Sequence, residues 1–126
     1  MTISYESVKN TTWNLDGTSK VTYMINTMDI QRTGLSEELI KEISTIASKW
    51  GVQKVILFGS RSRGDYGRAS DIDLAVSGGD FTQFCLNIEE NAWTLLKFDI
   101  INLDDPLEPD FRAMIQKEGV TLYEKI

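Results

Sequence analysis

The sequence predicts an α/β (α+β) fold for one main domain, residues 31–126, preceded by an N-terminal extension, residues 1–30. Apolar residues recur at helical spacing in some segments and form short β-branched runs in others, and the two patterns alternate from residue 35 onward. The chain has 126 residues, of which 41% are hydrophobic and 2 are proline. A chain of this length and composition can bury the core of one domain.

Residues 1–30 are rich in Thr, Ser and Asn, and two interpretations stay open for them. Asp16 and Gly17 lie between segments in which apolar and polar residues alternate, which is the pattern of a β-hairpin turn. The alternative is a poorly ordered extension ahead of the domain.

The first predicted element of the domain is a helix that follows Ser36 and ends at Gly51. Ser36 is a favourable N-cap residue, and acidic residues in the next two positions suit the positive end of the helix dipole. Apolar residues then recur every three or four positions, which predicts a helix with one face on the core. These residues are Leu39, Ile40, Ile43, Ile46, Ala47 and Trp50.

The rest of the domain is expected to alternate between strands and helices. Asp80 can cap one helix, and Pro109 suits the first turn of another that stops at Gly119. The predicted elements, in order, are a strand over 54–58, a loop, a strand over 71–76, a helix after Asp80, a strand over 97–103, a helix from Pro109 and an edge strand over 120–124.

Composition excludes several classes of chemistry. The chain has no histidine and one cysteine, so it cannot use a Ser-His-Asp or Cys-His site, an imidazole zinc site or an internal disulfide. A net charge of -6 argues against a broad nucleic-acid surface, because such surfaces cluster Lys and Arg. No apolar run approaches the roughly 20 residues of a membrane span, and the N-terminus lacks the order of a signal peptide. We therefore expect a cytoplasmic protein without direct nucleic-acid or membrane contacts.

The strand over 71–76 carries two acids on one face. Because side chains alternate in a strand, Asp71 and Asp73 project to one side, opposite Ile72, Leu74 and Val76. Two adjacent carboxylates repel each other unless a cation or a proton lies between them. Mg²⁺ prefers such oxygen ligands, although a charge-protected edge strand would give the same pattern.

The loop before this pair supplies groups that suit a polyphosphate. Gly59 lets the backbone approach a phosphate, Ser60 offers a hydroxyl, and Arg61 and Arg63 are the preferred candidate cations, with Arg68 as a further one. The alternative for each arginine is a solvated side chain or one paired with a nearby acid.

A third acid, Asp99, lies in the middle of the predicted strand 97–103. An isolated Asp among apolar strand residues is unfavourable for folding, but it is explained if Asp99 joins the same metal site. The alternative is a strand-edge acid that pairs with Lys97.

These residues together carry a family resemblance. Gly59 and Ser60 are followed after ten residues by Asp71, within Ser70-Asp71-Ile72-Asp73-Leu74, and Asp99 lies in a later strand. This combination resembles the minimal nucleotidyltransferases of the DNA polymerase β-like superfamily. The resemblance implies a small mixed β-sheet flanked by helices, two Mg²⁺ ions and transfer of a nucleoside monophosphate from a nucleoside triphosphate.

The resemblance also implies roles for single residues. Asp71 and Asp73 would hold both metal ions, and Asp99 would hold the catalytic ion and help to deprotonate the attacking hydroxyl. Gly59 and Ser60 would grip the triphosphate, and the expected nucleotide-binding set also contains Arg61, Arg63 and Ser70.

Small members of this superfamily resemble antitoxins that act on a helical HEPN-domain ribonuclease toxin. We therefore expect transfer of AMP from ATP to a toxin hydroxyl, usually that of a tyrosine, within a hetero-oligomer. Two other functions stay open: a small-molecule nucleotidyltransferase of the aminoglycoside-modifying kind, and a non-catalytic nucleotide-binding module that neutralises its partner by binding.

Overall fold

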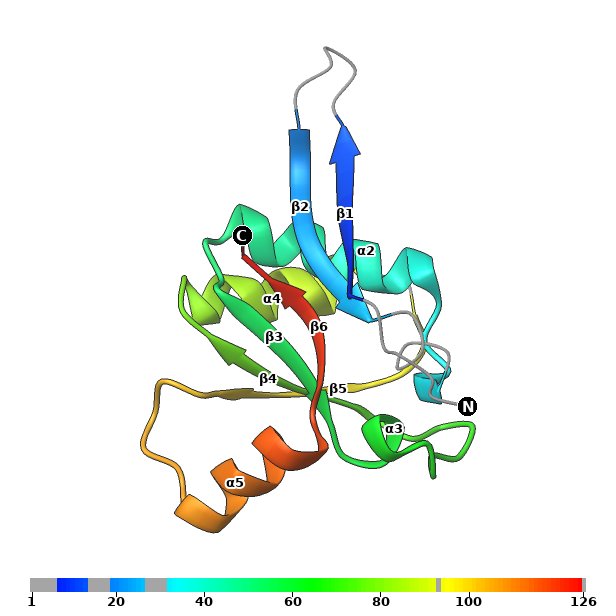
Figure 1. Cartoon of the computed structure of the whole chain (residues 1–126), viewed down its shortest axis with the longest axis vertical. Coiled ribbons are helices and arrows are strands. Elements are labelled where there is room, and N and C mark those ends of the chain that lie inside the picture. The colour runs from blue at the N-terminus through cyan, green and yellow to red at the C-terminus, as the bar shows by residue number, and fades with distance from the viewer. Residues whose placement is uncertain (1–6, 14–18, 27–31, 93, 126) are drawn as a thin grey trace.

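The computed structural model describes residues 7–13, 19–26, 32–92 and 94–125 (Figure 1). Within this part of the chain, no helix has the length and apolar character needed to cross a membrane. The described elements are β1 (Ser7–Trp13), β2 (Ser19–Asn26), α2 (Glu37–Lys49), β3 (Lys54–Phe58), α3 (Ser60–Arg63), β4 (Ile72–Ser77), α4 (Phe81–Asn91), β5 (Phe98–Asn102), α5 (Pro109–Glu118) and β6 (Val120–Glu124).

The domain is built on a mixed four-stranded sheet with the strand order β5-β4-β3-β6. Strand β3 pairs antiparallel with β4 and with β6, whereas β4 pairs parallel with β5. The parallel pair is joined through α4, because two parallel neighbours need a crossover connection. This is the small mixed sheet with flanking helices that the family resemblance implies, and the final strand lies at the edge of this sheet as expected.

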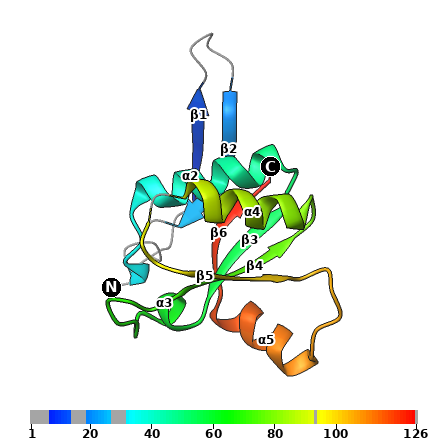
Figure 2. The ribbon, with the colours of Figure 1, turned by 180° about the vertical axis from the view of Figure 1, so that it is seen from behind.

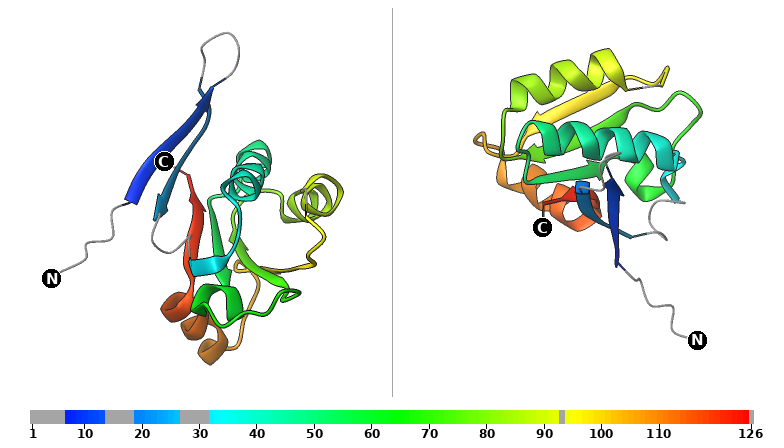
Figure 3. Two further views of the ribbon diagram at one scale, coloured as in Figure 1. Left: turned by 90° about the vertical axis from the view of Figure 1, so that its right-hand side faces the viewer. Right: turned by 90° about the horizontal axis from the view of Figure 1, so that it is seen from above.

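Helices cover the two faces of the sheet unequally (Figures 2 and 3). Helices α2 and α4 lie side by side on one face and bury the main core with alternate residues of the central strands. Helix α5 covers part of the other face, where Phe58 meets Phe111 with ring centroids 5.8 Å apart. The strand residues of the main core are Val55, Leu57, Ile72, Leu74, Val76, Phe98, Ile100, Val120, Leu122 and Tyr123.

The predicted helix caps are confirmed. The Ser36 hydroxyl accepts a hydrogen bond from the Leu39 amide at 3.1 Å, and the Asp80 carboxylate accepts one from the Gln83 amide at 3.1 Å. Each bond satisfies an amide that the first turn of a helix leaves without an internal partner. Pro109 occupies the first turn of α5, as its fixed φ favours.

The loop after β3 differs from the prediction. Instead of an open loop, residues Ser60–Arg63 form the one-turn helix α3, which ends at Gly64 in the left-handed conformation. Gly59 and Gly64 bracket this turn and both have positive φ, which glycine adopts without strain. Strand β4 begins at Ile72, so Asp71 directly precedes the strand rather than opening it.

Strands β1 and β2 form a separate two-stranded antiparallel sheet, in which Ser7 lies opposite Asn26. Strand β2 contacts β6 and α2, and the pair extends past α2 (Figure 1). The predicted turn at Asp16 and Gly17 lies outside the described residues. The division of the chain near residue 30 stays a prediction.

Candidate active site

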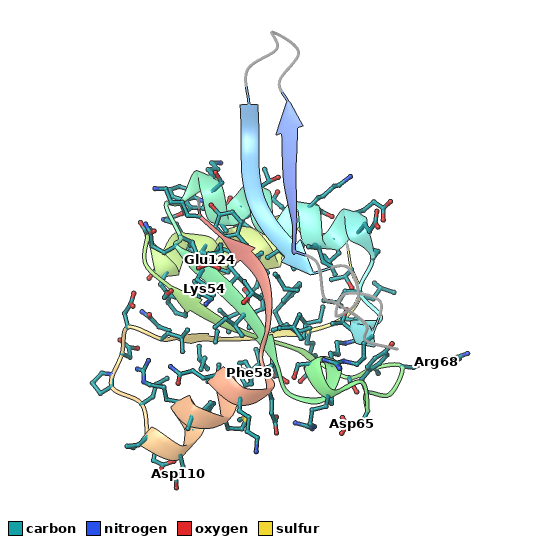
Figure 4. The ribbon with its side chains drawn as sticks, in the orientation of Figure 1. Lys54, Phe58, Asp65, Arg68, Asp110 and Glu124 are labelled. Atoms are coloured by element: carbon teal, nitrogen blue, oxygen red, sulfur yellow. The ribbon has the colours of Figure 1, made fainter. Side chains whose placement is uncertain are left out.

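Strand register places two of the predicted acids side by side. In the parallel pair of β4 and β5, Asp73 lies opposite Asp99, and in the antiparallel pair of β3 and β4 it lies opposite Phe58. Figure 4 shows Phe58 at the end of β3 where α3 and α5 approach. The acids therefore meet at the α3 end of the sheet, on the face that α5 covers only in part.

Asp71 and Asp99 both lie within electrostatic reach of Asp73. Burial raises the pKa of the half-buried Asp73 carboxyl above its ordinary value, and the charges of Asp99 and Asp71 raise it further. Asp71 and Asp99 are both exposed. A carboxyl whose ionised form is disfavoured by two like charges gains from a bound cation.

Gly59 brings the loop backbone into direct contact with Asp73. Its φ is +77°, and a Cβ atom built at this position would overlap Oδ2 of Asp73. Only glycine fits this position, both for its conformation and for the space that Asp73 leaves. The glycine-serine loop and the paired acids, ten residues apart in the sequence, are therefore one site.

Arg63 lies at the rim of the site. The charge of Arg63 lowers the pKa of Asp73, opposing the effect of the neighbouring acids. Its guanidinium is exposed and bonds Oδ2 of Asp65 at 3.0 Å and Oε2 of Glu118 at 3.1 Å. Figure 4 shows Asp65 on the loop beyond α3. Arg63 is thus a cation within electrostatic reach of the acids and accessible to solvent.

Arg61 points elsewhere. Its side chain is only 3% exposed, and its guanidinium donates to the carbonyl oxygens of Thr33 and Ser70. The Ser70 hydroxyl accepts a hydrogen bond from the Gly67 amide at 2.7 Å and closes a tight turn before Asp71. The phosphate role expected for Arg61 therefore has no support in this geometry, and the Ser70 hydroxyl already has a backbone partner.

The donor set suits a hard divalent cation. Three carboxylates are the oxygen ligands that Mg²⁺ prefers, and they come from one strand, the residue before it and the neighbouring strand. Among the described residues, however, no three acids or cysteines stand close enough to hold one metal ion together. The acids fit Mg²⁺ by type, and strand register sets Asp73 opposite Asp99.

The expected alternative for Asp99 finds no support. In the described part of the chain, no ion pair joins Asp99 to Lys97. The Lys97 carbonyl instead accepts a hydrogen bond from the Ile72 amide at 2.8 Å, which extends the β4 and β5 ladder by one step toward Asp71.

Sequence reasoning missed the residues that hold the loop. Thr33 and Gly34, before α2, contact Arg61 and Tyr66 of the loop. The contact between Thr33 and Arg61 spans 28 positions. No local periodicity indicates such a contact, although the glycine two residues before the N-cap of α2 was a weak signal of close packing.

Comparison with known proteins agrees with this geometry. A family model described as Polymerase beta, Nucleotidyltransferase matches residues 38–126. A protein of Methanocaldococcus jannaschii that carries the name "putative protein adenylyltransferase" is 38% identical over 99 residues, which cover 69% of this chain and 97% of that protein.

Two solved structures share the fold. A toxin-antitoxin crystal structure with AMP-PNP superposes with a TM-score of 0.56 at 24% identity, over 68% of this chain and 73% of that one. A crystal structure of the toxin-antitoxin MntA-HpeT, carrying substitutions, superposes with a TM-score of 0.55 at 22% identity and the same coverage. At these identities the likeness concerns the fold alone.

Proposed function

Because this chain belongs to the polymerase β-like nucleotidyltransferase family, we propose that it transfers AMP from ATP to a hydroxyl group of a partner protein. The observation that carries this proposal is the contact of the Gly59 backbone with Asp73, which itself lies opposite Asp99. A phosphate held by the loop would lie beside the acids that would hold metal, as an in-line displacement at phosphorus requires.

Each acid has a distinct task in this proposal. Asp71 and Asp73 would hold two Mg²⁺ ions, which when bound lower the pKa of an attacking hydroxyl and neutralise the pyrophosphate that leaves. Asp99 would accept the proton of the attacking hydroxyl as the new oxygen–phosphorus bond forms. The exposed position of Asp99 favours this task, because the acceptor must reach it from outside.

The loop residues would hold and orient the triphosphate. Gly59 allows close backbone approach, and Ser60 opens α3 directly beside it. Arg63 is the arginine whose placement supports phosphate binding, because it is exposed and near Asp73. To bind phosphate, Arg63 must exchange at least one of its carboxylate partners, Asp65 or Glu118, for the ligand.

The comparisons support ATP as the donor and a protein as the acceptor. The relative of 38% identity is named for protein adenylylation, and one structural neighbour was solved with AMP-PNP, an analogue of ATP. The other neighbour is described with two aspartates, two positions apart, replaced by glutamate. That spacing equals the spacing of Asp71 and Asp73.

Both structural neighbours are toxin-antitoxin assemblies, which supports an antitoxin role for this chain. The partner would be a HEPN-type ribonuclease toxin, and the two chains would form a hetero-oligomer. AMP on a toxin hydroxyl adds a negative charge and bulk, which can block a ribonuclease surface by repulsion of the RNA phosphates.

The test is a mass measurement on the partner. The protein is incubated with ATP, MgCl₂ and the all-helical product of the adjacent reading frame, which should carry an Arg, four residues and a His. We expect the intact mass of the partner to rise by whole AMP units, and the Asp73→Asn variant to give no rise. Leu95→Ala is the control variant, because Leu95 is fully exposed. It should modify the partner as wild type does.

Two outcomes would overturn the proposal. A partner left unmodified by the wild-type protein, while an aminoglycoside is adenylylated by the protein alone, would favour the small-molecule enzyme. A variant with all three aspartates changed to asparagine that still neutralises the toxin as well as wild type would favour a binding module.

A further inference from the structure

We propose that Arg61 is a positioning residue that fixes the turn carrying Asp71 against the segment 32–34, and that it is not a phosphate ligand. This inference rests on the proposed function in one respect, since it takes Asp71 as a metal-binding residue. Neither Arg61 nor the segment 32–34 takes part in the proposed AMP transfer itself.

The contacts of Arg61 join three parts of the chain. Its Nη1 donates to the Thr33 carbonyl oxygen at 3.0 Å, and its Nε donates to the Ser70 carbonyl oxygen at 3.2 Å. Its backbone belongs to α3, directly after Gly59 and Ser60. The planar guanidinium suits this task, because its donors point in fixed directions toward two acceptors at once.

The aromatic ring of Tyr66 closes the arrangement. The guanidinium carbon of Arg61 lies 4.6 Å from the centre of the Tyr66 ring, within the range of a cation–π contact. On the other side, the Tyr66 phenol lies directly against Gly34, where a Cβ atom would overlap it. Arg61 is therefore held between two carbonyl groups and a ring, and it is almost fully buried there.

The segment 32–34 touches the loop at one further point and is itself held by a local hydrogen bond. A Cβ atom at Gly64 would lie 2.9 Å from Cγ of Arg32, so this side chain covers the end of α3. The Thr33 hydroxyl accepts a hydrogen bond from the Leu35 amide at 3.1 Å, which fixes the backbone ahead of α2. The rigid helix α2 thus serves as the base on which the loop is held.

The segment 32–34 lies outside the part of the chain that the family model matches. The family model matches residues 38–126, so the segment 32–34 lies ahead of the matched region and directly after the part of the chain that contains β1 and β2. The loop that leads to Asp71 is therefore held by residues that lie ahead of the matched region. A truncation that begins the chain at the family boundary would remove one of the two carbonyl acceptors of Arg61.

Arg61 reaches the metal-binding acids only through the backbone. The carbonyl that accepts its Nε belongs to Ser70, the residue directly before Asp71. Asp71 lies outside β4, so the strand ladder does not fix it as it fixes Asp73. Loss of the Arg61 contacts should therefore displace Asp71 more than Asp73 or Asp99.

The first measurement is hydrogen exchange without nucleotide or metal. Three amides report on the arrangement: Leu35, Ser70 and Ile72, each of which has a hydrogen bond. In Arg61→Gln we expect the exchange of these amides to speed up about tenfold, since two hydrogen bonds to a charged donor are lost. Unchanged exchange would overturn the proposal, whatever the activity of the enzyme.

The second measurement separates positioning from phosphate binding by steady-state kinetics. We expect kcat of Arg61→Gln to fall about 10- to 100-fold, as misplacement of a catalytic group does, with little change in KM for ATP. Arg61→Lys keeps the charge but cannot bond both carbonyls, so it should recover only part of kcat. A large rise in KM with unchanged kcat, or full recovery by Arg61→Lys, would overturn the proposal. If Arg61→Gln does not fold, Arg61→Lys carries both measurements.

Arg112→Gln is the matched control. Arg112 also bonds two backbone carbonyls, those of Leu103 and Asp105 at 2.8 and 3.2 Å, but it does so after the far end of β5. This variant should change neither the three amides nor kcat. If wild-type protein transfers no AMP, the proposed function fails, and the exchange measurement alone then decides the role of Arg61.

Discussion

The two faces of strand β4 are made by alternate residues of one short segment, and they have opposite character. Ile72, Leu74 and Val76 are fully buried under α2 and α4. On the other face, Ala75 is buried against α5, whereas Asp73 is only half-buried and lies beside the exposed Asp99. Asp73 of the candidate site thus lies directly between two residues of the main core, Ile72 and Leu74.

This difference shows how a small domain can combine stability and chemistry. Burial of the main-core face holds β4 in register, and the register in turn sets Asp73 opposite Asp99. The ionised carboxylate of Asp73 contributes little to stability, because burial and like charges disfavour it. Changes to the main-core residues of β4 should therefore act on folding, and changes to Asp73 or Asp99 on activity.

The largest expected effect on folding comes from the main-core face. Leu74→Ala removes a fully buried side chain and should lower the free energy of unfolding by about 2–5 kcal/mol. Chemical denaturation monitored by circular dichroism measures this loss. Leu95→Ala is the control, because Leu95 is fully exposed and should change stability by less than about 0.5 kcal/mol. Equal losses in the two variants would contradict the division between the faces.

The next effect concerns the contact between the loop and the acidic face. Gly59→Ala should reduce AMP transfer by about 100-fold, because the new methyl group displaces the carboxylate of Asp73. Gly51→Ala is the control: its φ is +71°, but the nearest atom to its Cβ is 3.9 Å away. Both glycines have a positive φ, but the φ of 77° and ψ of -156° at Gly59 are essentially restricted to glycine. Gly59→Ala should therefore lose both stability and activity, whereas Gly51→Ala should keep its activity.

Sequence reasoning succeeded wherever the signal was local. Ser36 and Asp80 were predicted as caps from residue type and position, and both cap a helix. The strand over 54–58 has the predicted bounds, because its β-branched run is bounded by turn residues. The alternation in β4 correctly separated the core residues Ile72, Leu74 and Val76 from Asp73, since side chains alternate along this strand.

The features that could not be predicted from the sequence depend on contacts between distant segments. Arg61 and Arg63 lie two positions apart with the same charge, yet one is buried against Thr33 and the other is exposed. Their difference follows from the turn of α3, a helix too short to leave a periodic pattern. The pairing of Asp73 with Asp99 likewise depends on strand order, which no single segment encodes.

A smaller effect is expected on ATP binding when the Arg63 cation is removed and the neighbouring acids are kept. Arg63→Gln removes an exposed cation near Asp73 and should raise KM for ATP about fivefold, as loss of one charge-assisted phosphate contact does, with kcat and the melting temperature nearly unchanged. Glu118→Gln is the matched control, because it removes a partner of Arg63 and leaves the cation in place. A fall in kcat without a change in KM would place Arg63 outside the phosphate site.

The smallest expected effect is a gain in stability. Asp73→Asn keeps the shape of the side chain and removes a charge whose ionisation is disfavoured by burial and by Asp99. At pH 7, without metal, this variant should melt about 1–3 °C above wild type, a modest gain because solvent screens the half-buried group. Differential scanning calorimetry measures the difference.

The pH dependence of that gain identifies its cause. The pKa of Asp73 is raised in the folded state above its ordinary value of 3.8, so the folded protein binds this proton more tightly than the unfolded chain. Wild type and Asp73→Asn should therefore melt together below that ordinary value, where Asp73 is protonated in both states. As the pH rises through the raised pKa, wild type loses stability relative to the variant, and MgCl₂ should restore it in wild type alone. A difference that persisted unchanged at low pH would assign the gain to packing rather than to charge, and the acidic face would then differ from the main core only in exposure.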